Sequence, residues 1–397
     1  MKEESTIRFF TRAKSLFFWL FVPLVVSFLY LILFRLEKEL HLFKKTMRTY
    51  RRALAEVTNG VGLQMPLLGG VPVPRELQNI PLAEKMGIVL GTKKVSIRDI
   101  LAPYNASIIE NGSGYLLFFR YDVIKQNLPH PFFSHIGMVE LDAHFEQTEK
   151  AFRKIETHSN FSEDPRILKA GNAFYLIYND LVPYEQYSRT MRIANIDLKN
   201  CALHFSSELN LNLQPVEKNW VPFEFIGENS QPIVYFEYQL NPHKILALLN
   251  PQSGTFDHLT IPTESSLQNL FWSDIWGKPR GGTTARRIGD QYLAFFHSSF
   301  HDRDGIVWYL MGAYTFEAKP PFRVTAISNF PILFEGIYDS PPLNTANPLL
   351  RAIYPCSFVF EQQNGKHLIH VACGENDSCV KIVTMDEEAL LKSLKKL

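Results

Sequence analysis

The sequence predicts an all-β protein, a five-bladed β-propeller, preceded by one transmembrane helix and a helical stem. Three observations support this fold class. From about residue 100 onward, short apolar and aromatic runs alternate with Gly, Asn and Asp, which is typical of β-strands joined by turns. A turn followed by such a run recurs five times, and an uncharged segment of 20 residues stands near the N-terminus.

The repeats set the architecture of residues 100–397. The recurring runs are separated by 60, 60, 57 and 75 residues, which leaves room for about four short strands in each repeat. A β-sandwich would also contain many short strands, but it gives no reason for a period near 60. Five such units therefore predict a five-bladed propeller. The residues that mark the runs are Tyr115, Tyr175, Tyr235, Tyr292 and His367.

The segment from Ser15 to Phe34 is predicted to cross a membrane. Its 20 uncharged residues are long enough, as a helix, to span a bilayer core of about 30 Å. The sequence thus divides into a tail (1–14), a transmembrane helix (15–34), a stem and linker (35–99) and the propeller (100–397). Four basic residues precede the helix and seven follow it, which favours a single-pass protein with its body on the cytoplasmic side. The opposite orientation stays open.

The charge of the chain is divided between these parts. Residues 1–60 carry 11 basic and 5 acidic side chains, and the remaining residues carry 30 and 35. A body with an acidic excess does not favour general binding to nucleic acid. The four cysteines lack the spacing of a zinc site, and His297 and His301 lie on a predicted strand, so neither a metal nor a cofactor is expected. Whether Cys373 and Cys379 pair stays open.

Three polar clusters interrupt the apolar strands. In SEDPR, Pro165 is expected to hold Asp164 in an extended conformation, with Arg166 close enough to form an ion pair. KNW contains Lys218, and GGTTARR contains Arg286 in a turn suited to an anion. Each cluster alone is also compatible with a structural role.

The motifs FSEDPRI, FFRYD, GGTTARRIGDQYLAFFHSS and YPCSFVF, with the late GENDS turn, resemble glycoside hydrolase family 130, which comprises mannoside phosphorylases and hydrolases with a five-bladed propeller. They are also similar to the related glycosyltransferase family 108. The resemblance runs in order from about residue 100 to residue 387.

The resemblance implies a site residue by residue. Asp164 matches the general acid, which in that family protonates the glycosidic oxygen through a substrate hydroxyl, with inversion at the anomeric carbon. Lys218 and His297 match positions that help to bind phosphate, and Arg286 is a further candidate for an anion. The matches to positions that contact the sugar are Asn105, Ser107, Arg120, Asp122 and Asp377.

The sequence departs from that pattern near the phosphate. Tyr238 and Gln239 stand where many phosphorylases have a second phosphate-binding arginine. The arginines that could compensate are Arg280, Arg286 and Arg287. For a hydrolase, Glu224 or Glu237 could activate water, although the sequence does not locate either glutamate relative to the site.

The function that follows is a membrane-anchored carbohydrate-active enzyme that transfers β-mannosyl units with inversion, to phosphate or to a sugar acceptor. The alternatives are a β-mannoside hydrolase and a non-catalytic carbohydrate-binding propeller. The expected partners are a β-mannoside oligosaccharide or glycan, inorganic phosphate or a sugar phosphate, and membrane lipid through the N-terminal helix.

Overall fold

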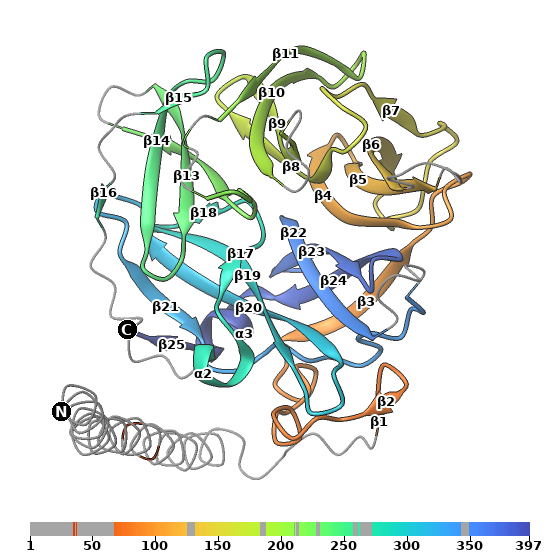
Figure 1. Ribbon diagram of the computed structural model, residues 1–397, viewed down its shortest axis with the longest axis vertical. Helices are drawn as coiled ribbons and strands as arrows, with labels where there is room; N and C mark the ends of the chain where they lie inside the picture. The colour runs from red at the N-terminus through yellow and green to blue at the C-terminus, as the bar shows by residue number, and fades with distance from the viewer. Residues whose placement is uncertain are drawn as a thin grey trace, which may run out of the picture. The chain divides into compact units, whose positions relative to one another are not determined.

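Figure 1 shows the computed structural model of the chain, which divides into two units, Met1–Gly60 and Val61–Leu397. The structure describes Arg35, Glu37 and residues 67–124, 132–182, 188–209, 211, 214–227, 231–256, 261–262, 272–342 and 349–397. The predicted transmembrane segment lies outside these residues. Of the helices that the structure describes, none is long and apolar enough to cross a membrane.

The second unit is mostly β, and in its described part the strands form five groups that follow one another around a centre (Figure 1). Within each group the strands are antiparallel and follow mainly in chain order. The first three groups are β4 (Pro103–Asn111), β5 (Gly114–Ile124), β6 (Phe132–Leu141) and β7 (Arg153–Ile155); β8 (Glu163–Ala170), β9 (Ala173–Leu181), β10 (Arg189–Asp197) and β11 (Ala202–Glu208); and β12 (Val221–Ile226), β13 (Pro232–Gln239), β14 (Lys244–Asn250), β15 (Thr255–Phe256) and β16 (Ile261–Pro262).

The last two groups are joined into one sheet, because β20 pairs in parallel with β22 over a few residues. The fourth group contains β17 (Arg280–Gly281), β18 (Arg286–Ile288), β19 (Gln291–His301), β20 (Val307–Glu317) and β21 (Val324–Ser328); the fifth contains β22 (Leu350–Gln363), β23 (Lys366–Glu375), β24 (Cys379–Asp386) and β3 (Val89–Val95). The five sequence repeats fall near the start of the strand that is second in hydrogen-bonded order within each group, at β5, β9, β13, β19 and β23; in the fourth group β17 and β18 both pair with β19.

Both ends of this unit take part in the sheets. The strand β3 pairs with β24, so the propeller sheets begin before residue 100, inside the range expected to be linker. The helix α3 (Glu387–Ser393), capped by the Asp386 carboxylate, is followed by β25 (Leu394–Lys396), which pairs with β21. The short elements β1 (Leu67–Leu68), β2 (Val71–Pro72) and α2 (Trp272–Trp276) complete the described set.

The hydrophobic core lies between neighbouring groups. Leu117 of the first group and Val359 of the fifth belong to one buried cluster, and Phe118 and Leu176 belong to another between the first and second groups. A third cluster joins the second group to the third. Burial of these faces drives the groups to pack against one another, since apolar area removed from water stabilises by about 25 cal/mol per Å².

The first strand of each group faces the centre. The strand β4 contacts both β8 and β22, and β8 contacts β12, so these strands lie side by side around the axis. Side chains at the same end of each strand therefore converge although they are far apart in the sequence. All four cysteines are free, so Cys373 and Cys379 do not pair.

Candidate active site

Two β-bulges turn polar side chains toward the centre. Between Tyr104 and Ser107 the strand β4 has two residues opposite one of β5, and β8 has the same irregularity between Glu163 and Arg166. The bulged residues Asn105 and Asp164 have φ angles of 46° and 55°. Asn and Asp adopt this left-handed region more readily than most residues, and a bulge re-aims the side chains that it carries. The expectation that Pro165 keeps Asp164 extended is therefore wrong, because the bulge sets its conformation.

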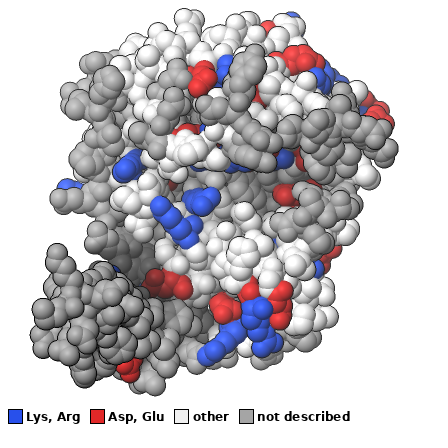
Figure 2. Space-filling view, viewed as in Figure 1, with Lys and Arg blue, Asp and Glu red and all other residues white. Residues whose placement is uncertain are grey.

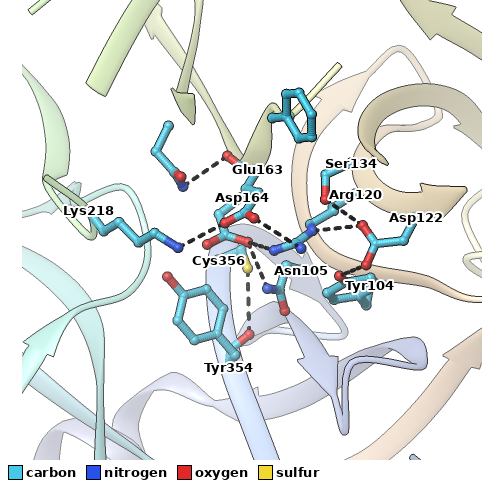
Figure 3. A network of polar contacts seen from close by, with 12 residues as sticks. Tyr104, Asn105, Arg120, Asp122, Ser134, Glu163, Asp164, Lys218, Tyr354 and Cys356 are labelled. Carbon is cyan, nitrogen blue, oxygen red and sulfur yellow. Dashed lines mark hydrogen bonds and ion pairs between the residues drawn. The ribbon is translucent and has the colours of Figure 1, made fainter. Parts of the chain in front are cut away.

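Asp164 lies at the middle of the resulting cluster (Figure 3). Its Oδ1 accepts a hydrogen bond of 2.8 Å from Asn105 Nδ2 and lies 3.5 Å from Arg120 Nη1. Burial alone would raise the pKa of this carboxyl, but Arg120, Lys218 and the Asn105 hydrogen bond together lower it below its ordinary value. Asp164 is thus an ionised, firmly held carboxylate at neutral pH.

Arg120 ties Asp164 to two further carboxylates. Its Nε lies 3.2 Å from Asp122 Oδ1 and its Nη2 lies 3.2 Å from Glu163 Oε1. Its guanidinium also stands 4.9 Å from the centre of the Tyr104 ring. Asp122 in turn accepts a hydrogen bond of 2.6 Å from the Tyr104 hydroxyl. Because the Arg120 side chain is only 16% exposed, these ion pairs are weakly screened by water.

Glu163 is a central member of the site that the sequence did not single out. Its carboxylate pairs with Arg120, with Arg189 and, at 2.9 Å, with Lys218 Nζ. It therefore holds Lys218 beside Asp164 (Figure 3). Glu163 stands next to Asp164 in the EDPR motif, but sequence gives no sign that three cations from distant parts of the chain converge on it.

Arg166 does not form the expected ion pair with the Asp164 carboxylate. It contacts only the backbone oxygen of that residue, at 3.4 Å, and it donates hydrogen bonds to the Gly282 oxygen and to the Tyr354 hydroxyl. Tyr354 donates onward to Asn219 Oδ1 at 2.5 Å. The fully buried guanidinium thus connects the second, third, fourth and fifth groups, and its charge still acts on Asp164.

Asp377 lies in the turn between β23 and β24, within the electrostatic field of this cluster. Burial raises the pKa of its carboxyl to about 6, Arg120 opposes the shift, and the neighbouring carboxylates, first Asp164 and then Asp122 and Glu163, add to it. The structure thus places Asp377 near Arg120, Asp122 and Asp164, and Asn105 is hydrogen-bonded to Asp164 in the same cluster.

His297 is buried within the electrostatic field of Arg166 and Asp164. Burial, then Arg166 and Arg280, lower its pKa to about 3, so the imidazole is neutral at physiological pH. Its ring lies 4.6 Å from that of Tyr354, and its Nδ1 has no hydrogen-bond partner among the described residues. The exposed Arg280 is the cross-strand partner of His297 and adds positive charge to this side of the site.

Two predicted site residues are placed elsewhere. The Ser107 hydroxyl is fully buried and accepts a hydrogen bond of 2.9 Å from the Ile167 amide, so it ties β4 to β8. The Arg286 guanidinium pairs with both carboxylate oxygens of Glu110, at 2.5 and 3.0 Å, and lines a separate cavity. The bulge in β4 lies beside Ser107, and Arg286 of β18 pairs with Glu110 from another group, so sequence spacing revealed neither outcome.

The two glutamates considered as bases for a hydrolase do not join Asp164. Glu237 is fully buried, 2.9 Å from His243 Nε2 and 2.7 Å from the Tyr314 hydroxyl. Glu224 accepts a hydrogen bond from the Gly171 amide at 2.7 Å. Neither carboxylate has a recorded contact with the cluster around Asp164.

The site combines hydrogen-bonding groups with positive charge. Carboxylates and an amide, from Asn105, Asp122, Asp164 and Asp377, offer the hydrogen bonds that a polyhydroxylated ligand needs. Lys218, Arg280 and Arg166 add positive charge near Asp164 and His297. Such an arrangement suits a sugar next to an anion. Figure 2 shows that the face in view carries both basic and acidic side chains.

Solved structures share this fold. A mannose phosphorylase from Leishmania mexicana, in complex with a phosphate ion, matches with a TM-score of 0.53 and 14% identity, covering 79% of this chain and 93% of its own. A β-1,2-mannobiose phosphorylase from Listeria innocua, in complex with β-1,2-mannobiose, matches with a TM-score of 0.53 and 13% identity, covering 78% and 97%. A putative glycoside hydrolase from Parabacteroides distasonis matches with a TM-score of 0.51 and 11% identity, covering 72% and 87%.

No protein-family model and no curated protein matches the chain by sequence. The likeness is therefore one of fold at low identity. Over most of its length the chain is structurally similar to the mannoside phosphorylases and hydrolases of glycoside hydrolase family 130, as the motifs predicted.

Proposed function

We propose that the chain is a carbohydrate-active enzyme that transfers a β-mannosyl unit with inversion, to inorganic phosphate or to a sugar acceptor, on a five-bladed propeller. The observation that carries the proposal is the placement of Asp164 on a bulge at the centre, hydrogen-bonded to Asn105 and flanked by Lys218. The fold shared with two mannoside phosphorylases supports the substrate class.

In the proposed reaction the mannosyl ring binds among Asn105, Arg120, Asp122 and Asp377. Phosphate binds beside Lys218, with Arg280 and Arg166 adding positive charge, and attacks the anomeric carbon from the face opposite the leaving sugar. Asp164 gives its proton through a substrate hydroxyl to the glycosidic oxygen as that bond breaks. The products are α-mannose 1-phosphate and the released sugar, so atoms and charge balance.

The low pKa of Asp164 makes this scheme depend on the anion. In the free protein the positive charges of Arg120 and Lys218 favour the ionised carboxylate. A phosphate bound beside Lys218 offsets part of that charge, and a nearby like charge raises the pKa of a carboxyl. Anion binding and protonation of Asp164 are therefore coupled, which supplies the acid only when the nucleophile is present.

The full chain, incubated with β-1,2-mannobiose, is expected to release mannose 1-phosphate only when phosphate is supplied. Chromatography of the products with and without phosphate checks this. Equal release of mannose in both reactions would mean hydrolysis, and transfer that requires a nucleotide sugar would mean a glycosyltransferase. Absence of any turnover, also with other β-mannosides, would refute the enzymatic proposal.

A second candidate is a propeller that binds a carbohydrate without turnover. It is favoured by one observation, the lowered pKa of Asp164, which is the opposite of what a general acid needs in the free enzyme. Mannobiose binding by calorimetry, together with no product in any of the reactions above, would favour this candidate.

We propose, from the sequence, that Ser15–Phe34 anchors the chain in a membrane with its body on the cytoplasmic side. Its support is the uncharged length of the segment and the basic residues that follow it. The full chain is expected to stay in the membrane pellet after alkaline extraction, whereas a chain that lacks residues 1–60 is expected in the supernatant. Release of the full chain by alkali would contradict the anchor.

A further inference from the structure

The first strands of the groups line a cavity at their end opposite to Asp164. The cavity has a volume of about 490 Å³ and is lined by side chains from β4, β8, β12, β18 and β22. Asn105 and Asp164 lie at the beginning of β4 and β8, whereas Glu110 and Lys169 lie near the ends of the same strands. Five residues of strand separate Asp164 from Lys169, so the two regions lie roughly 15 Å apart.

The lining of this cavity has an excess of positive charge. Lys169, Arg286 and Arg287 contribute three cations against the carboxylates of Glu110 and Glu224. Both carboxylates are already engaged, Glu110 by the bidentate pair with Arg286 and Glu224 by the Gly171 amide. Glu110 is paired with Arg286, whereas Glu224 keeps its negative charge, so the three cations and two carboxylates leave the lining with one positive charge in excess.

Lys169 and Arg287 have no carboxylate partner among the described residues. The Lys169 ammonium lies 5.9 Å from the centre of the Phe174 ring, and Arg287 Nε donates to the Gly289 oxygen. Both side chains are exposed at the cavity. Arg287 keeps its terminal amino groups for a ligand, and a guanidinium binds phosphate oxygens in a bidentate manner.

Apolar side chains form the rest of the lining. Ile109, Ile167 and Leu168 lie beside the half-buried Phe360, and Ile226 is 51% exposed although it is a large hydrophobic residue. A volume of this size accommodates a small molecule but not a folded partner. The apolar surface suits the carbon face of a compact ring, and the adjacent cations suit an anionic group attached to that ring.

We propose that this cavity binds a small phosphate ester, with the phosphate at Lys169 and Arg287 and a ring on the apolar side chains. Arg286, fixed by Glu110, contributes charge to the site. The proposal concerns a site separate from the one around Asp164 and does not depend on the reaction that occurs there.

The test uses the full chain in detergent and titrates glucose 6-phosphate by calorimetry, with glucose and inorganic phosphate as reference ligands. Glucose 6-phosphate is expected to bind more tightly than either reference. The double variant Lys169→Ala/Arg287→Ala is expected to weaken that binding roughly tenfold or more, because two charged hydrogen-bond donors are lost. Lys93→Ala, which removes an exposed lysine paired with Glu146, is the matched control and is expected to leave binding unchanged.

Lys218→Ala distinguishes the two sites. If the cavity is the binding site, this variant retains glucose 6-phosphate binding. Loss of binding in Lys218→Ala with retention in the double variant would place the ligand near Asp164 and overturn the proposal. Binding of glucose that is as tight as that of its phosphate ester, or no binding of the ester at millimolar concentration, would also overturn it.

Discussion

Replacing Asp164 by asparagine is expected to lower kcat for mannoside turnover by about 10²- to 10⁴-fold, the usual contribution of a positioned general acid. Asparagine has nearly the same shape as aspartate but cannot release a proton to the glycosidic oxygen. KM is expected to change less than kcat, because the sugar contacts made by the other residues remain. Steady-state kinetics with and without phosphate measure both quantities.

This variant is also expected to fold. Asp164 has a φ of 55°, a conformation that asparagine tolerates at least as well as aspartate. The amide oxygen of the new side chain can still accept the hydrogen bond from Asn105 Nδ2. The matched control is Asp304→Asn, an exposed aspartate between β19 and β20. Wild-type turnover by Asp164→Asn, with the control also active, would rule out Asp164 as the acid.

Replacing Arg120 by methionine is expected to lower the free energy of unfolding by about 3–5 kcal/mol at pH 7. Methionine fills much of the space of the arginine stem but leaves the carboxylates of Asp122, Glu163 and Asp164 without the cation that they share. Breaking a buried ion pair from one side is costly because the remaining charges stay desolvated. Denaturant unfolding monitored by tryptophan fluorescence measures the loss.

The loss of unfolding free energy caused by Arg120→Met is expected to be smaller at lower pH. In the wild type Arg120 helps to hold the pKa of Asp164 below its unfolded value, so this contribution to stability is present above the unfolded pKa and is lost as pH falls through the folded one. In the variant the carboxyls protonate more easily, which relieves their repulsion. The difference in unfolding free energy between the wild type and Arg120→Met is therefore expected to be smaller at pH 5 than at pH 7.

Arg286→Met is the matched control for this experiment. Arg286 also pairs with a carboxylate, Glu110, but their side chains are 25% and 45% exposed. Such a pair contributes about 0–1 kcal/mol because water screens it. A loss of stability in Arg120→Met no larger than in Arg286→Met would contradict the assignment of Arg120 as the shared counter-ion of the site.

The repeat period predicted the arrangement of the strands, since each repeat marks the second strand of one group. The resemblance, and not the period, named Asn105, Asp122 and Asp164 as site residues. Asn105 and Asp164 lie near the beginning of β4 and β8, and Asp122 lies near the end of the antiparallel strand β5, so the three lie at the same end of the ring. A backbone period is visible in the sequence when the same apolar pattern returns. The sequence did not reveal where the ring of strands begins, because β3 is far in sequence from β24, the strand with which it pairs.

The details of the site could not be predicted, because they depend on bulges and on long side chains from different groups. The bulge in β4 turns Ser107 to the Ile167 amide, and the bulge in β8 gives Asp164 a positive φ despite the proline that follows it. Arg166 extends across the centre to Tyr354, so its position next to Asp164 in sequence was misleading. One or two residues of register decide each of these contacts.

The pairing of β3 with β24 has a consequence for synthesis of the protein. About 280 residues separate Val95 from its partner region at Cys379–Asp386. At roughly 5–20 residues per second, a ribosome needs roughly 15 to 60 s to produce them. During that time β3 lacks its hydrogen-bond partner β24, and Asp377 has not yet been placed beside Asp164. The ring, and with it the complete site, closes only after β24 has been synthesised.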